Sequence, residues 1–435
     1  MHKIVHLDLN GMCPPVCKLI ELISIFAKAG YDGLMIGWED KFPWSQKEFR
    51  SERAFSPDDI TVIQKTALDN GLFFIPMIQC LGHMENFLYP ERYAHLREIP
   101  NRNDCLNPLA PGALEFVMDL LEEMLALSPD IKFIHIGGDE VWTLGMHPDT
   151  KAFIERHSKA ELYLKHVIPI LDMLNERGIK PMLWHDMLIK WDREHLLSIK
   201  DRADIVFWGY ELPVYEVSDK YHYNIQNIRY FAKLGLNLWG AGAYKGGSGP
   251  DSIMPDKQAL MNNAQSWYRA AHEFGFKGLI ATGWSRYSQF HPPCDPVFLS
   301  LDSLFIVSAI FEGNDNKSQA LFKMREVLME CGIFEQVEEL KTVASEFIRE
   351  RDVAWACVRN LSQQYEMERK FLQGKNSHIS KIMLETLQQQ IRKLEQVGAR
   401  FKKLLSGLTY REQISEFIDT KIDAIKSFVD NKSED

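Results

Sequence analysis

The sequence contains no long run of hydrophobic residues and few cysteines. No stretch of the chain approaches the roughly 18 consecutive apolar residues that a membrane span requires. The first residues lead directly into a strand-like segment, without the charged and apolar regions of a signal peptide. The seven cysteines are an odd number without regular spacing, which excludes a full intrachain disulfide framework. These absences predict a cytoplasmic protein that does not bind a membrane.

Positive charge is also in deficit, and several motifs of common enzyme classes are missing. The 50 basic residues against 60 acidic ones give a net charge of −10, which predicts no nucleic-acid partner. There is no GxGxxG after the first strand-like segment, no GxSxG and no HExxH. Cys13 and Cys17 lack the second Cys/His pair of a structural zinc site. We therefore expect no cofactor and no bound metal.

The residues that are present indicate a regular alternation of strands and helices in the first three quarters of the chain. Amphipathic helical patterns, such as 17–29, 114–127 and 153–177, separate eight strand-like segments. Eight strands with helices between them predict a (β/α)8 TIM barrel over residues 1–314. An open doubly wound sheet is the alternative. The predicted strands are 4–11, 33–40, 72–79, 133–140, 180–188, 204–210, 237–244 and 278–284.

The last part of the chain, residues 315–435, has a different pattern. Apolar residues recur there at helical spacing within highly charged sequence, as in Leu340, Ala344 and Phe347. This pattern predicts a C-terminal all-α extension of three or more long amphipathic helices. The extension could pack on itself and on the barrel, or it could form a homodimer.

Asp139 and Glu140 are adjacent acids at the predicted end of the fourth strand. Neighbouring side chains of a strand point to opposite faces, so both reach one site only where the strand ends or twists. Gly137 and Gly138 permit this, because glycine tolerates unusual backbone angles. Crowding separates the two pKa values, so that one carboxyl stays protonated and the other anionic, which suits glycoside hydrolysis. The alternative is that the two acids merely cap the next helix.

Four tryptophans lie near the ends of successive predicted strands. Barrel interiors are filled mainly by Val, Ile and Leu, so we expect these indoles at the mouth of the barrel, where they can stack on a sugar. Any one of them could instead belong to the core. The four are Trp184, Trp208, Trp239 and Trp284.

The strand ends also carry histidines and further acids that could converge on a metal ion. The candidates are His6, Asp8, His83, Glu85, His135 and Asp186. No HxH or HExxH spacing supports a metal, but a metal-dependent barrel hydrolase or isomerase remains an alternative. A non-catalytic glycan-binding barrel is another, although a binding protein has no need of a proton donor.

The hexapeptide His135-Ile136-Gly137-Gly138-Asp139-Glu140 resembles the H-x-G-G-D-E signature of family 20 glycoside hydrolases, the β-N-acetylhexosaminidases. Residues 6–9, 39–43, 82–85, 107–108 and 282–284 are similar to the hexosaminidase D branch of that family, and the resemblance covers about residues 1–310. It implies an exo-acting, retaining enzyme for terminal β-linked GalNAc or GlcNAc. In this mechanism the 2-acetamido oxygen of the substrate attacks the anomeric carbon and forms an oxazoline.

The resemblance also implies roles for individual residues. Glu140 is the general acid and then the base, and Asp139 orients and stabilises the acetamide. His135 orders the fourth strand, and His83 supports the acid. The remaining residues implied to contact the sugar are Trp184, Trp208 and Trp284 as walls, Tyr244 or otherwise Tyr210 for the acetamide oxygen, and Glu39, Asp40, Asp186 and Arg286 for hydroxyls.

Two segments depart from the family pattern. The first strand ends in Leu7-Asp8-Leu9-Asn10, where most members carry an arginine that binds sugar hydroxyls. The usual Trp-x-Glu near the eighth strand reads Trp284-Ser285-Arg286, so a base replaces an acid. Hydroxyl recognition therefore does not transfer in detail, and a preference for GalNAc is only a weak expectation from the branch.

Overall fold

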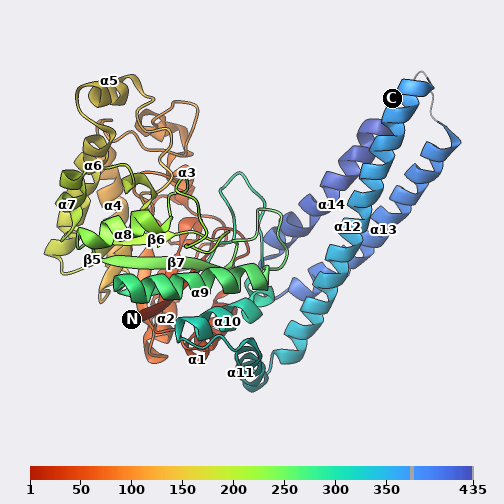
Figure 1. Ribbon diagram of the computed structural model, residues 1–435, viewed down its shortest axis with the longest axis horizontal. Helices are drawn as coiled ribbons and strands as arrows, with labels where there is room; N and C mark the ends of the chain where they lie inside the picture. Colours follow the sequence, from red (N-terminus) through yellow and green to blue (C-terminus); the bar gives the residue numbers. More distant parts are fainter. Residues whose placement is uncertain (373–376, 434–435) are drawn as a thin grey trace.

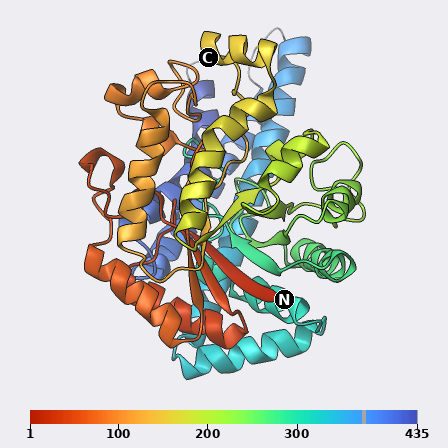
Figure 2. The same cartoon turned by 90° about the vertical axis from the view of Figure 1, so that its left-hand side faces the viewer.

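Eight parallel strands form a closed barrel at the centre of the protein (Figures 1 and 2). The computed structural model describes residues 1–372 and 377–433. The strands pair in chain order, and β8 pairs with β1 to close the barrel. The predicted (β/α)8 fold is confirmed. The strands are β1 His2–Asp8, β2 Gly33–Gly37, β3 Phe73–Met77, β4 Phe133–His135, β5 Lys180–Trp184, β6 Asp204–Trp208, β7 Leu238–Lys245 and β8 Gly278–Gly283.

Helices surround the barrel and connect its strands. The predicted helix 153–177 is two helices, because His157 leaves helical geometry and the Ser158 hydroxyl then caps a new helix by accepting the Glu161 N–H. The α-helices up to the end of the barrel are α1 Val16–Ala29, α2 Pro57–Asp69, α3 Glu85–Leu88, α4 Ala113–Ala126, α5 Pro148–Arg156, α6 Lys159–Glu176, α7 Arg193–Ile199, α8 Ile225–Lys233, α9 Lys257–Phe274 and α10 Leu301–Phe311. The short 3-10 helices are η1 Glu39–Lys41, η2 Lys47–Phe49, η3 Glu91–Leu96, η4 Asp186–Leu188 and η5 Val297–Leu299.

Several strands end earlier than the sequence predicts. Strands β2 to β5 stop two to five residues before their predicted carboxyl ends, and the residues left over form loops or 3-10 turns. Glu39 and Glu140, which follow β2 and β4, have φ angles of 49° and 47°. A strand cannot continue through this left-handed backbone geometry. The polar residues at the carboxyl end of the barrel are therefore presented on short loops.

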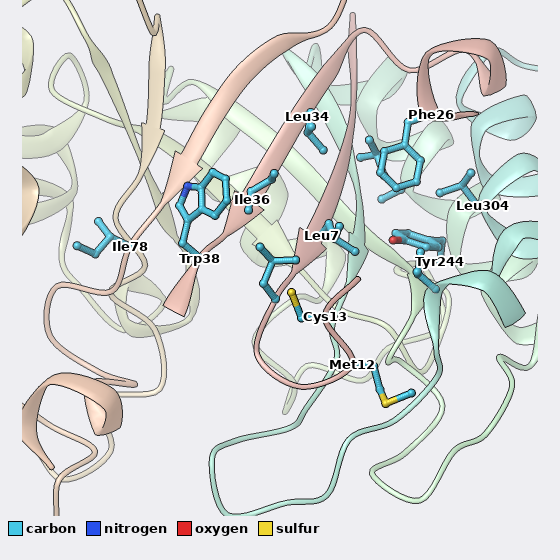
Figure 3. Packing of buried hydrophobic residues seen from close by; sticks show 14 of the residues in the cluster. Leu7, Met12, Cys13, Phe26, Leu34, Ile36, Trp38, Ile78, Tyr244 and Leu304 are labelled. Atoms are coloured by element: carbon cyan, nitrogen blue, oxygen red, sulfur yellow. The ribbon is translucent and has the colours of Figure 1, made fainter. Parts of the chain in front are cut away.

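The barrel has an apolar interior and a second apolar layer between the strands and the helices. The interior includes Met35, Ile75, Val206 and Trp239. The outer layer includes Phe26, Leu34, Tyr244 and Leu304, which lie between the sheet and the surrounding helices (Figure 3). This double packing fixes the strand ends that carry the polar residues.

The chain ends in long helices that project from the barrel (Figure 1). They are α12 Phe334–Phe371, α13 His378–Leu405 and α14 Arg411–Ser433, preceded by α11 Lys317–Glu330, which packs against α1 and α10. Phe347, Leu394, Phe401 and Ile418 are buried among them. Within residues 1–372 and 377–433, no helix has the combination of length and hydropathy that crossing a bilayer requires.

Candidate active site

A cavity of about 360 Å³ opens at the carboxyl ends of the strands, the end where barrel enzymes carry their reacting groups. Its volume lies in the range of about 300–1,000 Å³ that is typical of small-molecule sites. Nine of the residues predicted for the site line it: Glu39, His83, Asp139, Glu140, Trp184, Trp208, Tyr210, Trp284 and Arg286.

The two glycines before the acid pair turn the chain into the cavity. Strand β4 ends at His135, and Gly137 and Gly138 follow with φ angles of 64° and 83°. A Cβ atom on Gly137 would lie 1.7 Å from Oε1 of Gln79, and one on Gly138 would lie 2.2 Å from the hydroxyl of Tyr163. Glycine is required at both positions by backbone geometry and by space. The turn brings Asp139 and Glu140 into the same cavity.

His83 contacts both carboxylates from the loop after β3. Its Nε2 lies 3.6 Å from Oδ2 of Asp139 and 3.3 Å from Oε2 of Glu140. Burial opposes protonation of this ring, but Asp139 and Glu140 outweigh it and raise the pKa of His83 to about 10. At neutral pH the imidazolium therefore links the two acids.

The pKa values of the two acids shift in opposite directions. Burial raises the pKa of Asp139 to about 7, against the opposing charge of His83. The hydrogen bond from His83 lowers the pKa of Glu140. The separation of the two pKa values agrees with the argument from crowding. Its direction is the reverse of the one expected, in which Glu140 is the protonated acid and Asp139 the anion. In the ligand-free protein, burial favours the protonated form of Asp139, and the hydrogen bond from His83 favours the ionised form of Glu140.

Asp186, on η4 after β5, fixes the backbone of Glu140 through a hydrogen bond. Its Oδ2 accepts the backbone N–H of Glu140 at 2.9 Å, and its Oδ1 accepts Nε1–H of Trp208 at 3.1 Å. Burial raises the pKa of Asp186 to about 6. Asp186 is not among the residues that line the cavity, so it orients an acid and an indole rather than facing a sugar hydroxyl.

Aromatic side chains form one wall of the cavity. Trp208 stacks on Tyr210 with ring centroids 5.5 Å apart, and Nε1–H of Trp284 donates to the Tyr210 hydroxyl at 2.9 Å. Trp184 lies 6.1 Å from Trp284 and contacts the buried His135 ring. This wall offers the flat apolar faces on which pyranose rings stack.

Two aromatic predictions are wrong. Trp239 is the second residue of β7 and lies on the floor of the barrel, where it stacks on His2 at 5.8 Å. Tyr244 is fully buried between the sheet and the helices, beside Phe26 and Leu304 (Figure 3). Inward residues alternate along a strand, so the inward Trp239 and Ala241 place Tyr244 on the outer face. Tyr210, the second candidate for the acetamide oxygen, does line the cavity.

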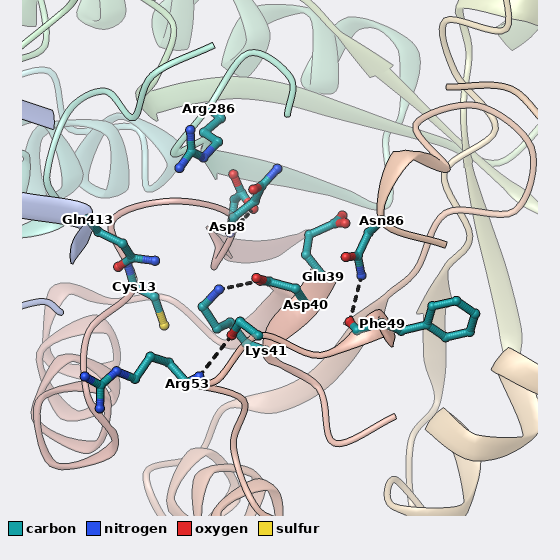
Figure 4. Close-up of polar contacts among 12 residues, drawn as sticks. Asp8, Cys13, Glu39, Asp40, Lys41, Phe49, Arg53, Asn86, Arg286 and Gln413 are labelled. Carbon is teal, nitrogen blue, oxygen red and sulfur yellow. Dashed lines mark hydrogen bonds and ion pairs between the residues drawn. The ribbon is translucent and has the colours of Figure 1, made fainter. Parts of the chain in front are cut away.

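His135 and Asp40 also lie outside the cavity lining. His135 is fully buried, and its Nδ1 accepts the N–H of Gly137 at 3.1 Å, so it fixes the start of the glycine turn. Asp40 forms an ion pair with the buried Lys41 (Figure 4). The prediction that Asp40 binds a sugar hydroxyl is wrong, because its neighbour Glu39 takes the cavity position instead.

Acidic groups from several strand ends face this cavity. Burial raises the pKa of Glu39 to about 8, and Asp8 and Glu85 add to the effect. Asp8 and Glu85 line the cavity as well, although the analysis of the sequence did not place them among the sugar-binding residues. Burial raises the pKa of Asp8 to about 6. The available signal was their position, because Asp8 ends β1 and Glu85 begins α3 after the loop that follows β3.

His222 is a cavity residue that sequence reasoning missed. The backbone N–H of Trp208 donates to Nδ1 of the buried His185 at 3.3 Å, and Nε2 of His185 lies 3.0 Å from Nδ1 of His222. Since His185 accepts at Nδ1, its neutral ring donates from Nε2, and His222 then carries its own proton on Nε2. The loop before α8 thus presents a fixed N–H donor at the cavity. No sequence pattern marks this loop.

The arrangement does not resemble a metal centre. Among residues 1–372 and 377–433, no group of three or more His, Cys, Asp or Glu side chains is placed to hold a metal ion. The histidines are instead engaged with carboxylates, backbone groups and one another, as in the contacts of His83 and His135.

Paired acids beside an aromatic wall, at the end of the barrel where reacting groups lie, fit the chemistry of a glycoside hydrolase. The catalytic-domain profile of glycosyl hydrolase family 20 matches residues 37–225. Hexosaminidase D of Bos taurus is 31% identical over 326 residues, which are 72% of this chain and 92% of that protein. The chain belongs to glycosyl hydrolase family 20.

Other relatives and solved structures agree with this assignment. Hexosaminidase D of Homo sapiens is 31% identical over 69% of this chain, and the match spans 64% of the human protein. The chitobiase of Flavobacterium johnsoniae superposes with a TM-score of 0.58 at 16% identity, covering 99% of this chain and 72% of that one. The β-N-acetylhexosaminidase of Bacteroides fragilis gives a TM-score of 0.56 at 17% identity, over 77% and 71% of the two chains. At these identities the structures support the fold.

Proposed function

We propose that the protein is an exo-acting, retaining β-N-acetylhexosaminidase that removes terminal β-linked GalNAc or GlcNAc through an oxazoline intermediate. One observation supports this above all others: Asp139 and Glu140 face the same cavity, and His83 contacts both of them. The aromatic wall of Trp184, Trp208 and Trp284 faces the same space.

In the first step, Glu140 donates its proton to the glycosidic oxygen as the bond from that oxygen to C1 breaks. The acetamide oxygen of the substrate forms a new bond to C1, which gives an oxazolinium ion. Asp139 accepts a hydrogen bond from the acetamide N–H and stabilises its growing positive charge. Tyr210, among the aromatic residues, supplies a phenol beside the acetamide site.

In the second step, the Glu140 carboxylate removes a proton from water while the water oxygen attacks C1. The bond from C1 to the acetamide oxygen breaks, and the acetamide is restored. Each step inverts the configuration at C1, so the product retains it. The same side chain serves as acid and then as base, as microscopic reversibility requires.

The ligand-free pKa values require the proton to move when the substrate binds. A sugar that covers Glu140 removes its water and raises its pKa, while the acetamide N–H stabilises the Asp139 anion. Both effects transfer the proton from Asp139 to Glu140. His83, which touches both carboxylates, remains charged and holds them in place.

Two variants test these roles. Glu140→Gln keeps the shape of the acid but cannot donate a proton, so kcat on a nitrophenyl β-hexosaminide should fall by about 100-fold or more. Asp139→Asn should lower kcat by about 100-fold and change KM less, because the acetamide is still bound but poorly stabilised. Glu155→Gln, an exposed position on α5, is the control. Near-normal rates in both site variants would contradict the proposal.

Three expectations from the sequence remain predictions. We propose that the substrate is an amino-sugar glycoside or glycoconjugate, that the enzyme acts in the cytoplasm, and that residues 315–435 form a helical C-terminal region that could mediate a homodimer. Cell fractionation and light scattering of the purified chain test the last two.

A further inference from the structure

The C-terminal helix α14 reaches the carboxyl end of the barrel. Gln413 lies beside Cys13 (Figure 4), and its Oε1 accepts the backbone N–H of Cys13 at 2.8 Å. The hydroxyl of Thr409, just before α14, donates to the Cys13 carbonyl at 2.8 Å. Cys13 lies in the loop after β1 that carries Asn10, which lines the cavity. Lys421, further along α14, is buried and approaches the loop after β8 at Pro293.

One α14 side chain makes a direct ion pair with a cavity residue. Arg286, three residues after β8, lines the cavity, and its side chain is 12% exposed. Its Nη1 and Nη2 donate to the two carboxylate oxygens of Glu416 at 2.7 and 2.6 Å. Nη1 also donates to the carbonyl of His291 at 2.6 Å. This bidentate geometry fixes the plane of the guanidinium.

The remaining donors of Arg286 form a second pair. A guanidinium has five N–H groups, and the contacts with Glu416 and His291 use three of them. Nε–H and the outer Nη2–H lie along the adjacent edge and point in the same direction. Two parallel donors match two neighbouring oxygen atoms, such as vicinal sugar hydroxyls.

The charges around the cavity explain why Arg286 needs a partner outside it. Asp8 lines the same cavity, and the charge of Arg286 acts on its carboxyl, so an unrestrained guanidinium would be drawn towards this acid. The Asp8 oxygens already accept backbone N–H groups from Asn10 and Ser285 at 2.8 Å. Glu416, which is not part of the cavity lining, holds Arg286 through its two hydrogen bonds.

We propose that Glu416 is a positioning residue of the active site, through which α14 orients Arg286 as a two-donor fork for sugar hydroxyls. The C-terminal helices are then part of the substrate site, and not only an appendage. The inference rests on the proposed function.

The same helix offers a matched control. Glu412, one turn earlier on α14, pairs with Arg53 at 2.9 Å, and both side chains are more than half exposed. Neither residue lines the cavity. Glu416→Gln and Glu412→Gln therefore each remove one carboxylate from α14 and break one ion pair with an arginine of the barrel, but only the first affects a cavity arginine.

The test measures kcat and KM of both variants on 4-nitrophenyl β-GalNAc and β-GlcNAc. We expect Glu416→Gln to raise KM by about tenfold with kcat within about twofold, because a lost charged hydrogen bond weakens binding by this order. Arg286→Lys, which keeps the charge but loses the fork, should raise KM to a similar degree. The double variant Arg286→Ala with Glu416→Gln should have the same KM as Arg286→Ala alone. Thermal melting of each variant checks that it is folded, and Arg286→Lys replaces Glu416→Gln if the latter does not fold.

Equal KM values for Glu416→Gln and Glu412→Gln, or additive effects in the double variant, would overturn the inference. A wild-type enzyme that hydrolyses neither substrate would refute the proposed function separately. Calorimetric binding of free N-acetylgalactosamine then decides the inference. Weaker binding to Glu416→Gln than to Glu412→Gln supports it, whereas equal binding, or no binding to the wild type, overturns it.

Discussion

His83 is the residue whose removal tests the electrostatics of the acid pair. We choose His83→Asn, because His83 has a φ angle of 52° and asparagine tolerates this left-handed geometry better than most residues. The substitution removes a cation whose Nε2 lies 3.6 Å from Asp139 and 3.3 Å from Glu140. Because the pKa of His83 is raised to about 10, the wild-type ring stays charged throughout the range from mildly acidic to neutral pH.

The sign of the effect follows from the charge. A nearby cation favours the ionised form of a carboxyl, so its loss raises the pKa of both Asp139 and Glu140. The active form of the pair carries one proton, on one of the two carboxyls. The pH profile of kcat/KM is therefore bell-shaped, and its acidic and basic limbs report the two pKa values of the pair. Both limbs should move to higher pH in His83→Asn.

The size of the shift can be bounded from the distances. At about 3.5 Å and an effective dielectric constant of about 20, the attraction is on the order of 4–5 kcal/mol, or about three pH units. Glu140 is 36% exposed, and solvent screening reduces this value. We expect a displacement of about one to two pH units.

The assay is the pH dependence of kcat/KM on 4-nitrophenyl β-GalNAc. His157→Asn is the control, since His157 also pairs with a glutamate, Glu161 at 3.1 Å, but lies outside the cavity. Its profile should match that of the wild type. A His83→Asn profile that overlays the wild-type curve, or moves to lower pH, would refute the electrostatic reasoning.

The other predictions concern the glycine turn, the aromatic wall and metal dependence. The new Cβ of Gly138→Ala would clash with the Tyr163 hydroxyl, whereas Gly178 has a similar φ angle and open space around it. In urea unfolding, we expect Gly178→Ala to lose about 1–2 kcal/mol of stability. Gly138→Ala should lose a further amount of about 1–3 kcal/mol and also its turnover. Equal losses would show that the contact does not matter. Trp208→Ala removes a cavity wall and the donor to Asp186, so KM should rise and kcat fall, each by about tenfold, while Trp142→Ala, exposed near the site, serves as the comparison. Dialysis against a chelator should leave kcat unchanged, and a loss restored by zinc or manganese would favour the metal-dependent alternative.

The barrel and much of the site could be predicted from local sequence patterns. The eight strands, the acid pair after two glycines and most of the aromatic wall lie within single strand-and-turn segments, where residue types determine the geometry. The errors arose where the exact strand bounds decide the outcome. Trp239 was predicted to lie at the mouth of the barrel, but it is the second residue of β7, at the start of the strand. The two-residue alternation that turns Trp239 inward turns Tyr244 outward.

The rest could not be predicted because it depends on contacts between distant segments. His222 reaches the cavity only through a loop held by His185, and Glu416 reaches Arg286 across 130 residues of sequence. The proton distribution is another example. It depends on the burial of Asp139 and on the hydrogen bond from His83 to Glu140, which no spacing in the sequence encodes.

The most direct test of substrate assistance compares sugars with and without the acetamide. The purified protein is assayed on the 4-nitrophenyl β-glycosides of GalNAc, GlcNAc, galactose and glucose under identical conditions. An attacking group held within the substrate predicts that kcat/KM for an acetamido sugar exceeds that of its hydroxyl counterpart by at least about 100-fold. Similar rates for galactose and GalNAc glycosides would contradict the mechanism.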